Sequence, residues 1–362
     1  MSSKKGGPNV LITGGAGFIG SNLAERLLQA PETQVRIFDN FSRGGVSRNV
    51  EWLKGKAQNN LEVIEGDVRD VNAVRKAVDG VSEIFHFAAQ VAVTTSVEEP
   101  ALDFQINAVG TFNVLDAARH SKHKPFVLFT STNKVYGALD SVPVIAEGTR
   151  YRAKDPEFRG VNELERLDFH SPYGCSKGTA DQYVRDFARI YGLPTVVFRM
   201  SCIAGPRQFG NEDQGWVAHF LYSALTEKKI TIFGDGMQVR DVLHVHDLID
   251  AMMRVRERTD ITKGQVYNLG GGAQRAISVM EMLDAIEKTT GKTVRLNYHA
   301  VRPGDQPLYI SDTSKLERQT GWRPRRNVSA ILKDIYEFWR ENNGLADARM
   351  AVGRGTAIGE VA

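Results

Sequence analysis

A glycine-rich turn close to the start of the chain limits the possible folds more than any other feature of the sequence. Gly14, Gly17 and Gly20 follow the apolar run at residues 9–12 and precede residues 21–28, where apolar side chains recur at helical spacing. This order predicts a strand, a tight turn and a helix. Gly14 permits the turn, Gly17 lets the backbone approach a pyrophosphate, and Gly20 lets the helix pack on the strand. The residues predicted to bind a dinucleotide here are Gly14, Gly17, Phe18, Ile19 and Gly20.

An acidic residue follows the second apolar run. Residues 35–38 are strand-like and lead to Asp39, nineteen residues after Gly20, where a carboxylate can bond the adenosine ribose and repel a 2′-phosphate. This position favours NAD over NADP. Arg43 is close enough in sequence to receive the additional phosphate, so NADP stays open as the alternative. The further cofactor contacts predicted in this stretch are Asn40, Ser42 and Arg43.

Small or polar residues end two more predicted strands. Residues 61–64 lead to Asp67 and Val68, and residues 84–87 lead to Ala88, Ala89 and Gln90. Ligands of open parallel sheets bind at the carboxyl ends of the strands. We therefore expect Asp67 and Val68 near adenine and the second group along the dinucleotide. A turn or a helix cap is the alternative role for Asp67.

Tyr173 and Lys177 are four residues apart, so a helix places them on one face. An unperturbed tyrosine has a pKa of about 10 and would rarely be ionised near neutral pH. A lysine ammonium beside the phenol, together with the positive charge of a nicotinamide, favours the ionised form. The pair therefore predicts a tuned acid/base. The spacing alone is a weak signal, and it gains weight from the glycine turn that precedes it.

Hydroxyl side chains gather where the strand-like run at residues 126–129 ends. A hydroxyl at a strand end can bond the substrate oxygen that is oxidised and share its proton with Tyr173, and the strand end alone leaves Ser131 and Thr132 both open for this role. The alternative is a turn stabilised by side-chain hydrogen bonds. Without the other motifs, the two interpretations have equal weight.

Over nearly its whole length the chain resembles the extended short-chain dehydrogenase/reductases of the nucleotide-sugar epimerase and dehydratase group, in the motifs above and in Asn107. The resemblance implies an α/β fold in which a Rossmann-type doubly wound parallel sheet accompanies a smaller α/β substrate-binding domain. It implies an enzyme with NAD as cofactor and with Thr132, Tyr173 and Lys177 as catalytic residues. It also assigns cofactor contacts to Asn107, Met200, Tyr173 and Lys177.

Three longer strings within the group, at residues 131–137, 167–178 and 207–217, resemble the CDP-paratose 2-epimerases, also called CDP-tyvelose epimerases, of lipopolysaccharide O-antigen biosynthesis. Two departures from other members support this. The 4-epimerases carry an Asn where this chain has Cys202, and the 4,6-dehydratases carry an Asp-Glu pair where it has Asn133 and Lys134. Without that acid, elimination of water has no proton donor at this position.

The resemblance implies transient oxidation at carbon 2 of the sugar. Tyr173 takes the hydroxyl proton while the hydride passes to NAD, and the hydride then returns to the opposite face of the 2-keto sugar. Arg240 and Arg302 are implied to hold the diphosphate, which suits the paired donors of a guanidinium; an ion-paired or surface arginine is the alternative. The implied substrate contacts are Gln90, Thr132, Asn133, Cys202, Gln208, Arg240, Arg302 and Asp305. Lys134 taken alone is more typical of a solvent-facing side chain.

Other functions stay open from the sequence. The first alternative is a nucleotide-sugar 4-epimerase, and the second is a dehydrogenase or reductase that releases its cofactor. The same fold also hosts regulators that bind a dinucleotide without turnover, but these are expected to lack the base. The presence of Thr132, Tyr173 and Lys177 favours an enzyme.

The length predicts two interleaved units. Residues 1–200 should form mainly the NAD-binding domain, with later segments at about 236–272 returning to it, and residues 201–342 mainly the substrate-binding domain. Residues 343–362 lack aromatic anchors and are expected to be a flexible tail. Residues 147–166 are rich in charge and predict a long loop, either a lid over the sugar, with Arg150 and Tyr151 as first contacts, or a surface excursion.

Charge and cysteine content exclude several classes of protein. The chain has 46 Lys and Arg against 43 Asp and Glu, with no long basic run, which excludes a nucleic-acid partner. It has no apolar stretch long enough for a membrane span and no apolar leader, so we expect a soluble cytoplasmic protein. Cys175 and Cys202 are expected to pack as free thiols. His244 and His246 lack further ligands in sequence, so no metal is predicted.

The resemblance also implies self-association. Helices at about residues 100–118 and 173–191 form a four-helix bundle between subunits in the group, and both carry apolar residues on more than one face here. A homodimer or homotetramer is therefore expected.

Overall fold

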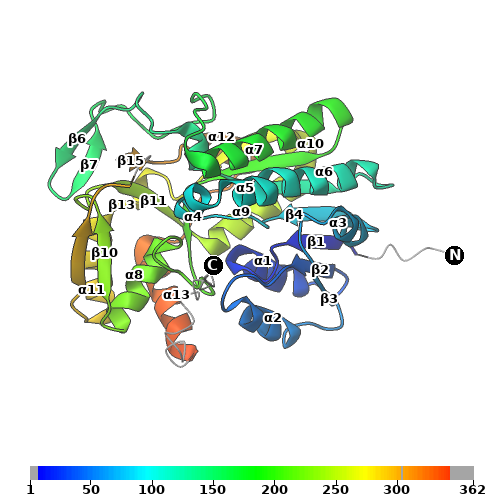
Figure 1. Cartoon of the computed structure of the whole chain (residues 1–362), viewed down its shortest axis with the longest axis horizontal. Helices are drawn as coiled ribbons and strands as arrows, with labels where there is room; N and C mark the ends of the chain where they lie inside the picture. The colour runs from blue at the N-terminus through cyan, green and yellow to red at the C-terminus, as the bar shows by residue number, and fades with distance from the viewer. Residues whose placement is uncertain (1–6, 303–304, 343–362) are drawn as a thin grey trace, which may run out of the picture.

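The computed structural model describes residues 7–302 and 305–342, and its largest sheet has seven strands whose neighbours all run parallel (Figure 1). The strand order is β12-β8-β5-β4-β1-β2-β3, so the chain moves outward from β1 in one direction and from β4 in the other. This is the doubly wound arrangement, and the predicted fold class is confirmed. The strands are β1 (Asn9–Thr13), β2 (Gln34–Asp39), β3 (Leu61–Glu65), β4 (Glu83–His86), β5 (Phe126–Thr132), β8 (Thr195–Met200) and β12 (Gln265–Leu269).

The central strands of the sheet bury both of their faces, which explains the unbroken apolar runs in the sequence. In β1, Val10 and Ile12 belong to the core on one face and Leu11 to the core on the other, because successive side chains of a strand point to opposite sides. The helices on the first face are α1 (Phe18–Leu28), α9 (Val245–Glu257) and α12 (Ser314–Thr320). Those on the second face are α3 (Val71–Val78), α6 (Gly110–His120) and α7 (Ser171–Tyr191).

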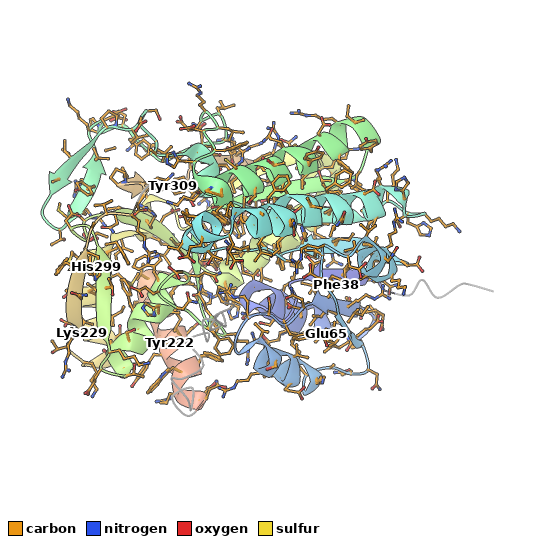
Figure 2. The ribbon with its side chains drawn as sticks, viewed as in Figure 1. Phe38, Glu65, Tyr222, Lys229, His299 and Tyr309 are labelled. Atoms are coloured by element: carbon orange, nitrogen blue, oxygen red, sulfur yellow. The ribbon has the colours of Figure 1, made fainter. Side chains whose placement is uncertain are left out.

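A smaller set of strands and helices lies to the left of the sheet in Figure 1, and Figure 2 marks this unit by Tyr222 and the sheet by Phe38. The central strand β11 pairs with β9, β13 and β15, while β10 pairs with β14. Three helices pack around a core of their own. The elements are β9 (Cys202–Ala204), α8 (Trp216–Leu225), β10 (Lys229–Phe233), β11 (Val239–His244), β13 (Ala276–Ser278), α11 (Val279–Thr290), β14 (Arg295–His299), β15 (Leu308–Tyr309) and α13 (Val328–Glu341).

The chain passes between the two units more than once. Strand β12 returns to the seven-stranded sheet, whereas β11, which also falls within residues 236–272, belongs to the smaller sheet. The domain boundary near residue 200 stays a prediction, and the predicted tail at 343–362 lies outside the described residues. Further short helices are α2 (Val46–Lys54), α4 (Val93–Glu98), α5 (Pro100–Phe104), a π-helix (Gln105–Val109), a 3-10 helix (Asn133–Tyr136), α10 (Thr259–Thr262) and a second 3-10 helix (Ala273–Arg275).

The start of the predicted long loop at residues 147–166 belongs to a hairpin, which corrects the sequence-based expectation. Strands β6 (Val144–Glu147) and β7 (Arg150–Ala153) pair antiparallel, and most of their side chains are exposed or only partly buried, so no apolar period marks them. Arg150 binds both carboxylate oxygens of Glu281, and the hydroxyl of Tyr151 donates to Asp235 at 2.6 Å. Neither residue lines the cavity described below. Their expected contacts with the sugar are therefore replaced by contacts that dock the hairpin.

In the part of the chain that the structure describes, none of the helices combines the length and the apolar character needed to cross a membrane.

Cys175 is exposed and Cys202 is partly buried, and both are free thiols. These two free thiols agree with the expectation that the chain has no disulfide framework.

His86, the last residue of β4, gives the fold a dependence on pH. Its buried ring lies 2.6 Å from the hydroxyl of Thr13 and 3.0 Å from that of Thr111. Burial, followed by the charge of Lys177, lowers the pKa of His86 to about 3. An unfolded histidine takes up a proton at about pH 6.5. The stability that neutral His86 contributes is therefore fully present above that pH and is lost as the pH falls from about 6.5 toward 3.

We expect this histidine alone to lower the free energy of unfolding by about 1.4 kcal/mol for each pH unit below 6.5. Urea unfolding at pH 7, 6 and 5 measures the slope. His86→Gln removes the titrating ring and keeps an amide that can bond the two hydroxyls, so its slope should be shallower. Equal slopes in the wild type and the variant would contradict the assignment.

Candidate active site

One cavity of about 720 Å³ brings together most of the residues that the sequence singles out. It lies between the carboxyl ends of the parallel strands and the smaller unit, and its volume suits a small-molecule site. The predicted cofactor residues in its wall are Gly14, Gly17, Phe18, Ile19, Gly20, Asp39, Asn40, Ser42, Arg43, Asp67, Val68, Ala88, Ala89, Tyr173, Lys177 and Met200. The predicted substrate residues in its wall are Thr132, Asn133, Cys202, Gln208, Arg240, Arg302 and Asp305.

The glycine turn leaves open space where a phosphate would lie. Gly14 has a φ of +68°, and a Cβ there would stand 2.7 Å from the backbone nitrogen of Ala88. A Cβ at Gly20 would collide with the backbone of Gly14 and Gly15. At Gly17, by contrast, a Cβ would meet only the carbonyl oxygen of Gly14, at 3.2 Å, and would otherwise project into the cavity. Helix α1 begins at the next residue without a side-chain cap, so its first N–H groups are available to an anion.

Asp39 and Arg43 lie together at the end of β2. The carboxylate of Asp39 accepts hydrogen bonds from the backbone N–H groups of Ala16 and Phe41, at 3.0 and 2.9 Å. Burial raises the pKa of Asp39 and lowers that of Arg43, while each charge partly offsets the effect on the other. A 2′-phosphate would compete with Asp39 for this guanidinium and would meet the carboxylate itself. The arrangement favours a ribose with both hydroxyls free.

Asp67 has partners that the sequence did not indicate. Arg69 binds both of its carboxylate oxygens, at 2.9 and 2.8 Å, and the side-chain amide of Asn40 donates at 3.0 Å. These bonds, led by that of Arg69, lower the pKa of Asp67 to about 2. The carboxylate therefore stays ionised and fixed at the edge of the cavity.

Gln90 and Asn107 are the two predicted binding residues that do not line the cavity. The amide of Asn107 pairs with the backbone of Gln90, accepting at 2.9 Å and donating at 3.0 Å. The side chain of Gln90 turns back to donate to the carbonyl of Ala92, at 2.7 Å. Both residues thus lie behind the wall, where they hold the loop of Ala88 and Ala89 in place. The binding roles that the resemblance implies for Gln90 and Asn107 stay predictions.

Thr132 and Tyr173 meet at the cavity wall, from the end of β5 and the first turn of α7. Tyr173 is 8% exposed, and its phenol lies near the side chain of Thr132, which acts to lower the pKa of the phenol. Thr132 also accepts a hydrogen bond from the backbone N–H of Lys134, at 3.2 Å. The two interpretations of this hydroxyl are therefore compatible, because it caps a turn and lies near the tyrosine at the same time.

The charge balance of the pair differs from the sequence-based expectation. Burial raises the pKa of Tyr173 to about 12; the side chain of Thr132 works against this rise and the charge of Asp103 adds to it. Lys177 is not among the groups that lower it. The Lys177 ammonium donates to the carbonyl of Thr130 at 2.7 Å and lies 4.2 Å from the ring centre of Phe129. Burial lowers the pKa of Lys177 to about 7, against the attraction of Asp103 and Asp181.

A cluster of charges lies at the substrate end of the cavity. Asp305 accepts from Arg240 at 2.6 Å and lies 3.5 Å from the ammonium of Lys134. Burial, followed by the charge of Arg240, lowers the pKa of Lys134. The expectation of a solvent-facing Lys134 is therefore wrong, since only 22% of its side chain is exposed and it lines the cavity. Its partner Asp305 was predicted as a substrate contact, but the sequence did not indicate that it pairs with Lys134.

The remaining predicted substrate residues also have defined partners. Arg302 stacks 3.8 Å from the ring centre of Phe233 and lies 3.5 Å from Asp213. The amide of Asn133 donates to Gln306 at 3.0 Å. The indole N–H of Trp216 donates to the sulfur of Cys202 at 3.3 Å, and burial raises the pKa of that thiol. Sequence reasoning did not single out Arg207, Phe209, Trp216 or Phe233 as cavity-lining residues.

Four buried oxygen atoms of cavity-lining residues have no hydrogen-bond partner within the described residues. They are Oγ1 of Thr94, Oγ of Ser131, Oε1 of Gln208 and Oε1 of Gln214. Gln208 uses its amide N–H to bind the carbonyl of Ile203, at 3.1 Å, which leaves its oxygen as an acceptor. Buried polar atoms are normally satisfied. These atoms therefore fit a site whose ligand carries hydroxyl or amide groups.

His244 and His246 gain a carboxylate neighbour that the sequence did not reveal. One side-chain ligand atom from each histidine and from Asp334 of α13 lie within 4.8 Å of one another. Nδ1 of His244 accepts from the backbone N–H of His246 at 3.0 Å, and Nε2 lies 3.0 Å from Asp334. With Nδ1 as an acceptor, Nε2 carries the proton, so the ring offers no lone pair to a metal without losing its cap on α9. The cluster is best described as a hydrogen-bonded link between α9 and α13.

Known proteins match the chain over almost its whole length. A family model for GDP-mannose 4,6-dehydratase matches residues 11–335. The CDP-paratose 2-epimerase of Salmonella typhi is 40% identical over 336 residues, covering 91% of this chain and 98% of that protein. The predicted resemblance to nucleotide-sugar epimerases and dehydratases is confirmed by these matches.

Solved structures agree with the sequence matches. The UDP-glucose 4-epimerase of Thermotoga maritima, solved with UDP-glucose, is 30% identical with a TM-score of 0.78, and the match covers 92% of this chain and 99% of that chain. The UDP-glucuronic acid 4-epimerase of Bacillus cereus, in complex with UDP-glucuronic acid and NAD, is 25% identical with a TM-score of 0.78 over the same shares of the two chains.

Proposed function

The chain belongs to the GDP-mannose 4,6-dehydratase family, and from this premise we propose that it is an NAD-dependent nucleotide-sugar epimerase that inverts carbon 2 of its sugar. The broader assignment, a nucleotide-sugar epimerase, is supported by the relatives over the full length of the chain. The choice of carbon and of nucleotide is the finer part of the proposal.

The proximity of Thr132 and Tyr173 is the observation that carries the proposal. A sugar hydroxyl bound beside this pair would hydrogen-bond to Oγ1 of Thr132 and give its proton to Oη of Tyr173. When bound, NAD supplies the hydride acceptor and the hydride donor of the reaction, and its positive ring adds the charge that the phenolate needs. The residues of the chain hold the alcohol in place and move its proton.

The cavity supports NAD as the cofactor. The open space at Gly17, the uncapped start of α1 and the Asp39 carboxylate form a cradle for a pyrophosphate and a ribose. The family member from Bacillus cereus binds NAD in a fold of the same shape. The catalytic pair lies in the wall of the same cavity, so hydride and proton transfer can take place side by side.

Inversion at carbon 2 is supported by the CDP-paratose 2-epimerase, which is the most similar of the relatives named above. It acts, by its name, on CDP-paratose at carbon 2. In this chain Asn133 is neutral and Lys134 is cationic and paired with Asp305, so neither side chain offers the carboxylic acid that dehydration requires. The related 4-epimerases make inversion at carbon 4 the second candidate.

The diphosphate is proposed to lie between Arg240 and Arg302. Both guanidinium groups line the substrate end of the cavity, and each is held by an acidic neighbour, Asp305 or Asp213. A diphosphate would replace part of these pairings with stronger bidentate bonds. The same end of the cavity holds the aromatic ring of Phe233, against which Arg302 stacks.

Exposed apolar side chains support a homodimer as part of the proposal. They lie on the helical layer formed by α4 to α7 and include Val97, Phe104, Phe112, Tyr183, Ile190 and Tyr191. Clusters of this kind on a protein surface mark interaction sites. We place the protein in the cytoplasm, as its soluble substrates and cofactor require.

The test is proton NMR of purified protein in deuterated buffer, without added cofactor, incubated separately with CDP-paratose, CDP-glucose, UDP-glucose and GDP-mannose. We expect inversion at carbon 2 of a CDP-sugar with no deuterium incorporated at that carbon, because the hydride returns without exchange with solvent. Inversion at carbon 4 would replace the proposal by its second candidate. Deuterium at the inverted carbon would contradict internal hydride return, and conversion of none of the sugars would contradict the substrate class.

A further inference from the structure

A loop of the smaller unit, residues 206–215, crosses to the dinucleotide end of the cavity. We call it the strap. The carbonyl of Pro206 accepts a hydrogen bond from Asn22 of α1, at 3.1 Å. The ring of Phe209 lies against Gly45, where an added Cβ would stand 3.1 Å from it. The strap is thus joined at two points to the unit that carries the glycine turn.

Arg207 forms the third and tightest junction of the strap. Its guanidinium carbon lies 3.1 Å from the ring centre of Trp52 on α2 and 5.3 Å from that of Phe338 on α13. Phe338 also meets the ring of Phe209, edge to face, with centres 6.1 Å apart. A cation between two aromatic rings is held by both of them. Residues from α2, the strap and α13 therefore form one stack, which we call the clamp.

The backbone and the charge of Arg207 indicate that the stack is a built feature. Arg207 has a φ of +69°, a left-handed conformation that side chains other than glycine rarely adopt. Burial lowers the pKa of Arg207 to about 10, and the acidic groups that act on it, Glu25 and Glu341, oppose this shift. A strained backbone and a partly desolvated cation persist only where the surrounding contacts compensate for both.

One side chain of the clamp, Arg207, lines the cavity in which a dinucleotide would lie. Arg207, Gln208 and Phe209 line the same cavity as the glycine turn and the residues around Asp39 and Arg43. The strap therefore faces the cradle from the other side of the cavity, and its release from Trp52 would open that side. An epimerase regenerates its cofactor in every cycle and has no need to release it.

We propose that the Trp52–Arg207–Phe338 clamp retains NAD in the enzyme between turnovers. The inference rests on the proposed function, because it takes NAD as the cofactor. It assigns a cofactor-retaining role to three side chains that come from separate parts of the chain. Opening of the strap, rather than loss of contacts at the glycine turn, would then limit the dissociation of NAD.

The experiment measures the rate at which NAD leaves the loaded protein. Protein saturated with NAD is diluted into buffer containing an enzyme that consumes free NAD, and bound NAD is quantified over time. We expect dissociation to be about tenfold faster in Trp52→Leu and in Arg207→Gln, which each remove one partner of the stack. The double variant should be no faster than the faster single variant, since the two changes break the same contact.

A matched control uses a cation–aromatic pair away from the cavity. Arg119 lies 4.9 Å from the ring centre of Tyr191, on α6 and α7, and Arg119→Gln should release NAD at the wild-type rate. Arg207→Lys keeps the charge but loses the planar stack, so it should fall between the wild type and Arg207→Gln. Circular dichroism identifies any variant that fails to fold, in which case the conservative Arg207→Lys variant carries the test.

The outcomes separate the clamp from the proposed function. Wild-type dissociation rates in both Trp52→Leu and Arg207→Gln would overturn the clamp while leaving the epimerase proposal intact. A wild-type protein that binds no NAD would overturn the proposed cofactor, and the clamp with it. Activity that is lost on dilution of Trp52→Leu and regained with added NAD would support retention, because damage to the chemical step would not be rescued in this way.

Discussion

Replacement of Tyr173 by Phe is expected to lower kcat by about 10³-fold, since general acid–base groups contribute about 10²–10⁴-fold. The phenol of Tyr173 lies at the cavity wall near Thr132, where it can take the proton of a bound alcohol. Phe fills the same volume, so the fold and the cofactor cradle should be unchanged. The variant should therefore bind NAD and nucleotide sugar as the wild type does, and fail only in turnover.

Initial rates with the sugar identified by NMR, together with the NAD content of the purified protein, measure this. Tyr183→Phe is the matched control, because Tyr183 belongs to the same helix, α7, but is 46% exposed and lies away from the cavity. It should keep the wild-type rate. If Tyr173→Phe retained more than a tenth of the activity, another group would have to be the base.

The local parts of the site could be predicted from the sequence. The glycine turn is encoded in a few consecutive residues, because the positive φ of Gly14 and the short distance between β1 and α1 at Gly20 restrict these two positions to glycine. The relation of Tyr173 to Lys177 follows from the helical repeat alone. The position of Thr132 follows from the rule that parallel strands end at one edge of the sheet.

Contacts between distant segments could not be predicted in this way. Asp305 reaches Lys134 and Arg240, and Trp52 reaches Arg207, only because the two units face each other across the cavity. No periodic pattern in the sequence indicates such pairs. The burial of Tyr173 and the charge of Asp103 near it also depend on distant segments, so the sequence did not indicate them.

The resemblance to a family identified positions but not always roles. Gln90 and Asn107 occupy the expected loop and helix, yet they bond to each other and to neighbouring backbone instead of facing the cavity. A side chain that supports a binding loop from behind is as restricted by its partners as one that touches the ligand. A motif alone therefore cannot distinguish the two.

The same substitution at two glycines of the turn should differ in its effect on the melting temperature. A Cβ at Gly20 would collide with the backbone of Gly14 and Gly15, neither of which can move without displacing β1 from α1. Overpacking of this kind costs about 1–3 kcal/mol. Gly20→Ala should therefore lower the melting temperature by several degrees, roughly 2–4 °C for each kcal/mol. Its NAD affinity should fall as well, because the turn itself is displaced.

Gly17→Ala should leave the melting temperature of the protein without cofactor near that of the wild type. Gly17 has an extended backbone with φ of −70° and ψ of 179°, which alanine adopts readily, and its Cβ would meet only one oxygen, at 3.2 Å. That methyl group would occupy the space where the pyrophosphate approaches the backbone, so NAD affinity should fall by about 100-fold or more. Thermal melts and calorimetric titration with NAD measure the two quantities. If Gly17→Ala bound NAD with wild-type affinity, the cofactor could not lie against this turn, whereas a large loss of stability would mean that Gly17 serves the fold instead of the ligand.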